Sequence, residues 1–264
     1  MEKRTLLQQV QVALKKPMFA HYYVLDFPKD MLLNRTYVTK RKPFRKARHC
    51  HVRLKFAREH QYWSDNDWKC VAFSDESHFE VLNRKNRSFV RRLRSEQDKP
   101  FNVRARAQGG GGCVSVWGCM TAEGIGPLTV YKGRVNGKKY IDMLNLSLPS
   151  FIKKRFKPGQ KWYFMQDNAP CHTCKFSKQW FEKKKYKLMR WPAASPDLNP
   201  IENLWDYIDK KLTHHRLSTA HELETIIKKL WSEINPETCN KLVESMPRRL
   251  QSCICVKGGT AAKY

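Results

Sequence analysis

The chain has 264 residues and carries 51 Lys or Arg against 24 Asp or Glu, so its formal net charge is +27. This excess favours a polyanion such as nucleic acid, while an anionic membrane surface or simple solubility remain open from charge alone. The sequence contains no run of about 18 apolar residues and no signal-peptide core, so we expect a soluble intracellular protein with no membrane partner.

The N-terminal part divides into a poorly defined segment, residues 1–39, and a basic helical linker, residues 40–66. Pro17 and Pro28 interrupt any sustained period in the first segment, which predicts only a weak helix near Thr5 to Leu14. Residues 40–58 contain no acid and fit a helix with one apolar side. They would bind phosphates, act as a nuclear address or form a solvated helix; the candidate DNA contacts are Lys40, Arg41, Lys42, Arg45 and Lys46.

Residues 67–264 read as one mixed α/β domain, a sheet flanked by helices. The pattern predicts a strand closing at Asp75, and the full set of predicted strands is 70–75, 78–83, 113–121, 126–132, 161–166 and a short last one at 186–191. The predicted helices are Lys138 to Phe156, Ala169 to Lys185, Ile201 to Leu212, 218–233 and 236–247.

A long basic insertion, about residues 83–112, separates two of these strands. Connections of this length within compact domains are often functional. Its candidate DNA-phosphate contacts are Arg91, Arg92 and Arg94, with a solvated loop as the alternative. Gly109 to Gly112 end the insertion; since no Lys followed by Ser or Thr comes after them, they predict a flexible connector rather than a phosphate loop.

Three acidic residues stand at the ends of three different predicted elements. Asp75 closes KCVAFSD, Asp167 closes KWYFMQD, and Glu202 lies in the first turn of the helix that follows Pro200. Carboxylates brought together from separate elements repel one another unless a divalent cation lies between them, so these three are candidate metal ligands. Taken one at a time, they also fit solvated turn acids and an acid complementing a helix dipole.

Cysteine offers a second metal hypothesis, which the spacing does not favour. Nine cysteines are scattered through the chain without a disulfide-like framework, as expected for reduced thiols. Cys171, His172 and Cys174 lie close together, but no second Cys or His pair with matching spacing accompanies them, as a structural zinc site would need. Oxygen-only ligands favour Mg²⁺ or Mn²⁺ instead.

Four separated motifs resemble the catalytic core of Tc/mariner-type DDE DNA transposases. They are FSDES at 73–77, GGGGCVSVWGCM at 109–120, QDNAPCH at 166–172 and SPDLNPIENLWD at 195–206. The 34 residues between Asp167 and Glu202 match the spacing typical of the Tc branch, and LVESMPRRLQ at 242–251 resembles the family's closing helix. The resemblance runs from about Lys40 to the C-terminus.

The resemblance implies an RNase H-like, retroviral-integrase-like fold with nuclease and strand-transfer chemistry. Two Mg²⁺ ions are expected, and Mn²⁺ would serve in their place. Asp75 would bridge the two ions, and Asp167 and Glu202 would each bind one of them. Asn168 and His172 would support the metal shell or contact DNA, although a helix-capping Asn and a surface His are the better explanations of each residue taken singly.

The expected partners are double-stranded transposon ends and a TA-containing target, in the nucleus. The insertion corresponds to a clamp that reaches a partner subunit in relatives, which implies a homodimer. The family's helix-turn-helix DNA-binding modules find no counterpart in residues 1–39. Two alternatives therefore stay open: a generic RNase H-like nuclease acting on RNA–DNA hybrids, and a host-adopted or inactive remnant that binds nucleic acid.

Overall fold

The computed structural model describes residues 45–81 and 111–260, all within one compact unit, residues 43–264. Several predictions lie outside the described residues: the segment 1–39, nearly all of the insertion, and the candidate DNA contacts Lys40, Arg41, Lys42, Arg91, Arg92 and Arg94. Within the described part, no helix is both long enough and apolar enough to cross a membrane.

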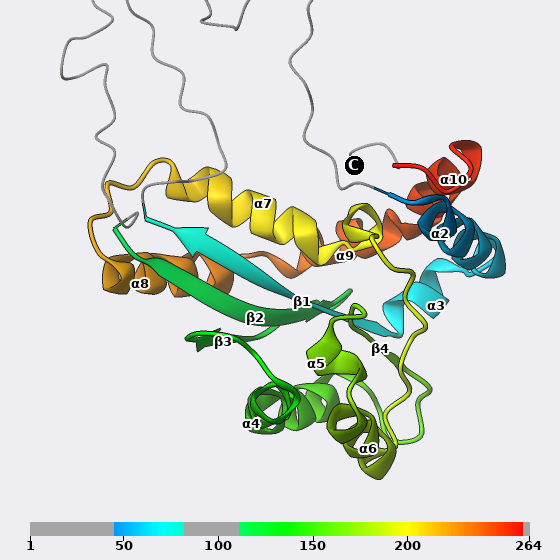
Figure 1. The fold of residues 1–264 in the computed structure, drawn as a ribbon, viewed down its shortest axis with the longest axis horizontal. Helices are drawn as coiled ribbons and strands as arrows, with labels where there is room; N and C mark the ends of the chain where they lie inside the picture. The colour runs from blue at the N-terminus through cyan, green and yellow to red at the C-terminus, as the bar shows by residue number, and fades with distance from the viewer. Residues whose placement is uncertain (1–44, 82–110, 261–264) are drawn as a thin grey trace, which may run out of the picture. The chain divides into compact units, whose positions relative to one another are not determined.

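A four-stranded mixed sheet forms the centre of the unit, in the order β3-β2-β1-β4 (Figure 1). β1 (Val71–Glu80) pairs antiparallel with β2 (Cys113–Thr121), which pairs antiparallel with β3 (Gly124–Tyr131). β4 (Tyr163–Met165) lies on the other side of β1 and runs parallel to it, with Phe73 opposite Met165. Consequently, the chain leaves β4 beside the middle of β1.

The strand β1 is longer than the sequence indicates. We predicted two strands, 70–75 and 78–83, with Asp75 at the end of the first; this was wrong, because the ladder with β2 continues without a break from Phe73 to Glu80. The polar run Asp75 to Ser77 stays in the strand because its backbone groups are paired with β2. Asp75 therefore lies in mid-strand, just beyond the end of β4.

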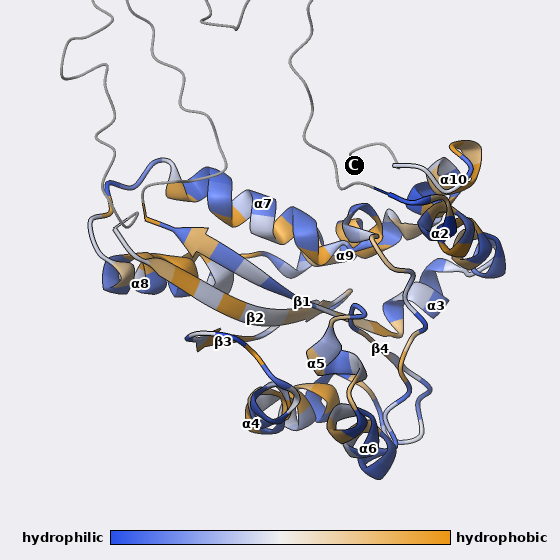
Figure 2. Ribbon diagram, in the orientation of Figure 1, coloured by the Kyte–Doolittle hydropathy of each residue, from blue (hydrophilic) through white to orange (hydrophobic). Residues whose placement is uncertain are grey.

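Helices cover both faces of the sheet (Figure 1). On one face pack α7 (Ile201–Leu212), α8 (Ala220–Ser232) and α9 (Pro236–Glu244), in a core that also takes in α2 (Ala47–Glu59), α3 (Asp65–Lys69) and α10 (Met246–Cys255). On the other face lie α4 (Gly137–Arg155), α5 (Pro170–Thr173) and α6 (Lys175–Lys184). α7 and α8 turn their hydrophobic sides toward the strands (Figure 2), as the apolar stripe of Ile201 to Leu212 predicts.

Three predicted elements end differently in the structure. The helix expected at 169–185 is split into α5 and α6, because Cys174 between them is extended. The helix expected at 236–247 stops at Glu244 and a separate helix, α10, follows; Pro247, which lacks an N–H, takes a place in the first turn of α10. The strand expected at 186–191 is reduced to one bridge, between Leu188 and Phe164.

Two arginines at the start of the described chain hold the loop that leads into α7. The carboxylate of Asp197, in the short 3-10 turn η4 (Pro196–Leu198), receives Nη1 and Nη2 of Arg53 at 2.8 and 2.7 Å, and Nη2 of Arg45 at 2.8 Å. The Arg53 side chain is fully buried and also donates to the carbonyl oxygens of Gly258 and Gly259 at 2.8 Å. The guanidinium of Arg45, which we expected to contact DNA, is therefore engaged inside the fold.

Arg249 of α10 completes this support. Its Nη1 donates to the carbonyl oxygen of Asp197 at 3.1 Å and its Nη2 to Oδ1 of Asn203, in the first turn of α7, at 2.7 Å. The loop before α7 is thereby fixed from α2 and from α10 at once. We call Arg45, Arg53, Asp197 and Arg249 the arginine–aspartate cluster.

Replacing Arg53 with Met is expected to lower the free energy of unfolding by about 3–5 kcal/mol, because it removes one partner of a buried ion pair. Urea unfolding at neutral pH measures the loss. Lys55→Ala on the same helix is the matched control: the Lys55 side chain is 66% exposed, its ion pair with Glu59 is on the surface, and its loss costs less than about 1 kcal/mol. Equal stabilities for the two variants contradict a structural role for the cluster.

The C-terminal turn sits directly against α2 because Gly258 has no side chain. A Cβ built on Gly258 would lie 2.0 Å from the carbonyl oxygen of Cys50, and its φ is +81°. Gly159 has the same φ of +81° but nothing within 4 Å of its Cβ position. The two glycines therefore share one backbone conformation and differ in the space around them.

This pair separates backbone strain from steric contact. Gly159→Ala is expected to cost about 1–2 kcal/mol for the left-handed conformation alone. Gly258→Ala should cost that amount and more, because α2 and the C-terminal turn must move apart. Thermal and urea unfolding of both variants measure the difference, and equal losses would show that the close approach adds no constraint.

Candidate active site

Burial and the neighbouring carboxylates disfavour the charged form of Asp75. Burial and the negative charges of Glu202 and Glu76 raise its pKa well above the ordinary value, with a further contribution from Asp167. The backbone N–H of Glu76, which donates to Oδ1 of Asp75 at 2.8 Å, opposes this shift without reversing it. The fold thus brings the three predicted acids, from β1, the segment after β4 and α7, into one neighbourhood.

The close packing of α7 on the sheet brings Glu202 near Asp75. Gly118 on β2 lies directly opposite Asp75 in the ladder, and a Cβ at Gly118 would come within 2.8 Å of the Trp205 ring and 3.2 Å of the Trp231 ring. Because Gly118 has no Cβ, the Trp205 ring can pack directly on the sheet. Ile201, Leu204 and Trp205 are all buried in the first two turns of α7. Glu202 lies between these apolar positions, near enough to Asp75 on β1 for its charge to raise the pKa of Asp75.

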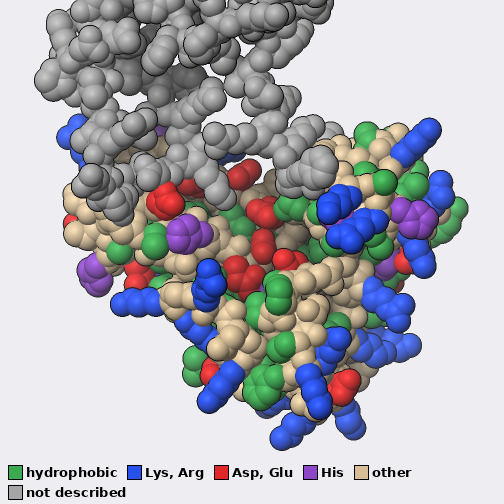
Figure 3. All heavy atoms as spheres, in the orientation of Figure 1, with side chains coloured by type: hydrophobic (Ala, Val, Ile, Leu, Met, Phe, Trp, Pro, Cys, Tyr) green, Lys and Arg blue, Asp and Glu red, His purple; other side chains and the backbone are tan. Residues whose placement is uncertain are grey.

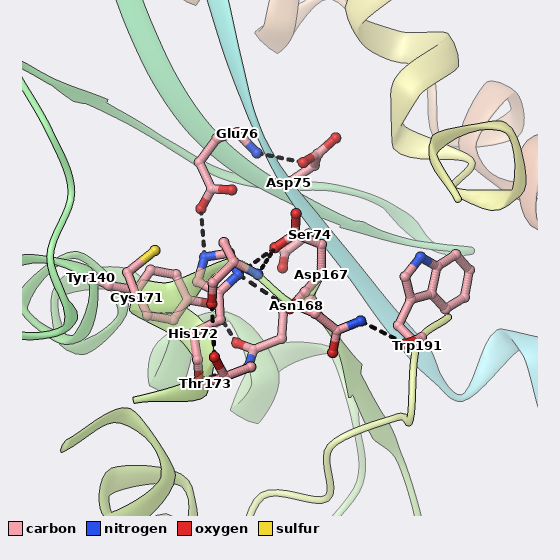
Figure 4. A network of polar contacts seen from close by, with 12 residues as sticks. Ser74, Asp75, Glu76, Tyr140, Asp167, Asn168, Cys171, His172, Thr173 and Trp191 are labelled. Atoms are coloured by element: carbon pink, nitrogen blue, oxygen red, sulfur yellow. Dashed lines mark hydrogen bonds and ion pairs between the residues drawn. The ribbon is translucent and has the colours of Figure 1, made fainter. Parts of the chain in front are cut away.

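His172 bridges two of the carboxylates (Figure 4). Its Nδ1 lies 2.7 Å from Oδ1 of Asp167 and its Nε2 lies 3.1 Å from Oε1 of Glu76. Burial alone would lower the pKa of His172, but the hydrogen bonds to Asp167 and Glu76 prevail and raise it to about 10. The imidazole is therefore a buried cation at neutral pH, and it is not the surface histidine that the sequence left open.

Asp167 is the least buried of these partners, with 56% of its side chain exposed. Burial acts to raise its pKa, but hydrogen bonds from His172 and from the N–H of Ala169 at 2.8 Å outweigh burial and lower it. Asp167 is consequently ionised at neutral pH. The neighbouring Asn168 does not cap a helix; its Nδ2 donates to the carbonyl oxygen of Trp191 at 2.9 Å and ties the segment after β4 to the loop before α7.

The acidic side chains gather in an open hollow on one face of the molecule, with Lys and Arg side chains around them (Figure 3). A cavity of about 270 Å³ lies elsewhere, lined by Lys69, Arg155 and Asn240 among others, and contains none of the predicted site residues. An open hollow suits a long substrate that passes across the surface better than a small molecule that must be enclosed.

The donor set fits a hard divalent cation, because the three predicted ligands offer only carboxylate oxygens. Burial and the neighbouring carboxylates raise the pKa of Asp75, and a bound cation would offset both effects by stabilising the charged form. As they stand, however, no three His, Cys, Asp or Glu side chains among the described residues are close enough together to form a ready metal cage.

The comparisons with known proteins decide the family. A family model described as "DDE superfamily endonuclease" matches residues 70–224, which include Asp75, Asp167 and Glu202. The chain belongs to this family. It is 33% identical over 224 residues to the Tc1 transposase of Caenorhabditis elegans, covering 85% of this chain and 81% of the relative. It is 32% identical over 218 residues to the Tcb1 transposase of Caenorhabditis briggsae, covering 83% and 79%.

Solved structures of the Mos1 mariner transposase share the fold. The Mos1 mariner paired-end complex with Mn matches with a TM-score of 0.74 and 18% identity, over 88% of this chain and 69% of that chain. The Mos1 catalytic domain matches with a TM-score of 0.65 and 16% identity, over 85% and 99%. The predicted RNase H-like fold and the predicted class, a Tc/mariner-type DDE transposase and nuclease, are confirmed; the roles of individual site residues stay predictions.

Sequence reasoning missed several DDE-domain residues on which the site depends. Glu76 stands beside Asp75 in FSDES, and its adjacency to a predicted ligand was the available signal. Asp197 lies within the motif SPDLNPIENLWD, but the motif gave no sign that two buried arginines bind its carboxylate. No sequence pattern links Asp197 to Arg53 or Arg249, because 144 and 52 residues separate the partners.

Asp75→Asn is expected to stabilise the metal-free protein at neutral pH. An acid whose pKa is raised by folding lowers stability as the pH rises above its unfolded value, 3.8, toward its folded value, and Asn removes this penalty. The gain should be present at pH 7 and vanish below about pH 4, where Asp75 is protonated in both states. Urea unfolding with a chelator at both pH values measures it.

Asp142→Asn is the control, because Asp142 is exposed on α4 and away from the other acids. It should leave stability nearly unchanged at both pH values. If the parent and the Asp75→Asn variant are equally stable at pH 7, folding does not raise the pKa of the Asp75 carboxyl.

Proposed function

We propose that this chain cuts double-stranded DNA at transposon ends and joins the exposed 3′-hydroxyls to a TA-containing target. The single observation that carries the proposal is that the fold brings Asp75, Glu202 and Asp167 near one another, so that the pKa of the Asp75 carboxyl is raised by burial, by Glu202 and, less strongly, by Asp167. The names of the relatives support it, since the similar Mos1 structures are paired-end and strand-transfer complexes. The same support favours a transposase over a generic hybrid nuclease.

Asp75, Asp167 and Glu202 would hold divalent Mg²⁺ or Mn²⁺, two ions in the proposed arrangement. Bound metal supplies activation of a water or a 3′-hydroxyl and stabilisation of the departing oxygen in an in-line displacement. Mos1 catalytic-domain structures with Mg and with Mn support this choice of metals. Asp75 would be the central ligand, because the charges of both Glu202 and Asp167 act on its carboxyl group.

The protein side chains contribute orientation and charge. Asp75 has a rigid backbone because it lies in mid-strand. Glu202 also has a rigid backbone, because the arginine–aspartate cluster fixes the start of α7. His172 keeps Asp167 ionised, as a metal ligand must be. The duplex would lie across the open hollow, and the net charge of +27 attracts its phosphates.

Partners and location follow from the same proposal. We assign transposon ends and target DNA as substrates, the nucleus as the site of action, and a homodimer as the working assembly, because two ends must be handled together. The candidate contact Lys46 is exposed at the start of α2 and is available to a phosphate. The described contact Arg45 is engaged with Asp197 and contributes to the fold instead.

Asp167→Ala is expected to reduce cleavage of duplex DNA at least about a hundredfold, the upper end of the loss seen when only a supporting partner of a metal ligand is removed. Nicking of a supercoiled plasmid with Mg²⁺ or Mn²⁺ measures it. Glu202→Gln should cause a similar loss. Asp206→Asn, one turn further along α7 and exposed, is the matched control and should cleave as the parent does.

Three results would contradict the proposal. Unchanged cleavage by Asp167→Ala removes the catalytic role of the acids. Absence of cleavage by the parent chain favours a nucleic-acid-binding remnant. Faster cleavage of an RNA–DNA hybrid than of duplex DNA of the same sequence favours a generic RNase H-like nuclease.

A further inference from the structure

Glu76 directly follows Asp75 on β1, but its carboxylate does a different task. Successive side chains of a strand leave opposite faces of a sheet, so Asp75 turns toward α7 and Glu76 toward α5. There, Oε1 of Glu76 lies 3.1 Å from Nε2 of His172, and 23% of the Glu76 side chain is exposed (Figure 4). Glu76 is thus linked to the segment after β4 through one imidazole ring.

The His172 ring has one orientation in this structure. Its centroid lies 4.2 Å from that of the buried Tyr140 ring, whose hydroxyl donates to Oε1 of Gln166 at 2.6 Å. The side-chain amide of Gln166 donates to the carbonyl oxygen of His172 at 3.4 Å. Because Nδ1 faces Asp167 and Nε2 faces Glu76, each ring nitrogen is directed at a carboxylate.

The consequence falls on Asp167. Both hydrogen bonds that its side chain accepts within the described residues go to Oδ1, from His172 at 2.7 Å and from the N–H of Ala169 at 2.8 Å. A carboxylate that is 56% exposed would otherwise rotate freely. With Oδ1 held at two points, the rotation of the group is fixed and Oδ2 is the oxygen left for a metal.

We infer that Glu76 is a positioning residue of this site: it anchors His172, which fixes Asp167 so that one of its oxygens is presented to the metal. This inference rests on the proposed function, in which Asp167 is a ligand. Partners of this kind, which orient a ligand without touching the metal, typically change metal affinity 10- to 100-fold when they are removed. Glu76 acts through another residue and is therefore not a catalytic residue.

The test measures metal binding separately from catalysis. Calorimetric titration of the full chain with Mn²⁺, without DNA, compares the parent with Glu76→Ala and Glu76→Gln. The alanine variant should bind about 10- to 100-fold more weakly, because His172 loses its anchor. The glutamine variant should bind nearly as the parent does, because its amide oxygen accepts the same hydrogen bond.

Two further variants complete the design. Glu80→Gln, on the same strand and face with a side chain that is 40% exposed, is the matched control and should not change affinity. Asp167→Asn should abolish the Mn²⁺ binding that depends on the Asp167 carboxylate. If Glu76→Ala does not fold, as judged by circular dichroism, Glu76→Thr replaces it, since threonine suits a strand.

The outcomes separate this inference from the proposed function. Parent-like Mn²⁺ affinity in folded Glu76→Ala overturns the positioning role. So does a loss in Glu76→Gln as large as that in Asp167→Asn, which would make Glu76 itself a ligand. A fall in melting temperature without a change in affinity also overturns it. If Asp167→Asn binds Mn²⁺ and cleaves DNA as the parent does, the proposed function fails instead.

DNA cleavage by the same variants, measured at increasing Mg²⁺ concentration, tests metal affinity independently. Glu76→Ala should need a higher Mg²⁺ concentration for half-maximal cleavage and approach the parent rate at saturating Mg²⁺. A rate that stays low at saturating Mg²⁺, with normal half-maximal concentration, contradicts the inference.

Discussion

The repulsion among carboxylates around Asp75 is the constraint on which this DDE domain depends. Partial burial of Asp75 and the approach of Glu202, Glu76 and Asp167 all disfavour its charged form, so the pKa of Asp75 is raised in the folded state. The remainder of the domain offsets this unfavourable effect: apolar helices pack on both faces of the sheet, and the cation of His172 lies between two of the carboxylates. A divalent cation would relieve the strain that remains, so the same repulsion that opposes folding favours metal binding.

The sequence allowed much of the architecture to be predicted, since apolar periodicity reports burial. β2 and α7 lie close to their predicted ranges because β2 is a nearly continuous buried run and α7 carries a regular apolar stripe. β1 was cut short because Asp75 to Ser77 break the apolar run, yet the partner strand satisfies their backbone. The division of α5 from α6 at Cys174 depends on backbone angles for which the sequence carries no strong signal.

The site was predicted only where a short motif marked it. Asp75, Asp167 and Glu202 each lie within a recognisable motif, and the fold places them together. The residues that hold them were missed, since Glu76 acts across the sheet and the arginine–aspartate cluster joins positions up to 152 residues apart. Such pairs follow from topology, and topology was available only through the resemblance to a family.

The arginine–aspartate cluster also sets where an independently folding catalytic piece of the protein must begin. A fragment cut just ahead of β1 would retain all three acids and every strand of the sheet. It would lack the guanidinium groups of Arg45 and Arg53, which pair with the Asp197 carboxylate, and the loop into α7 would be held by Arg249 of α10 without the contacts from α2. Excising the nuclease core as a working module therefore requires keeping a helix that contributes no side chain to the acidic hollow.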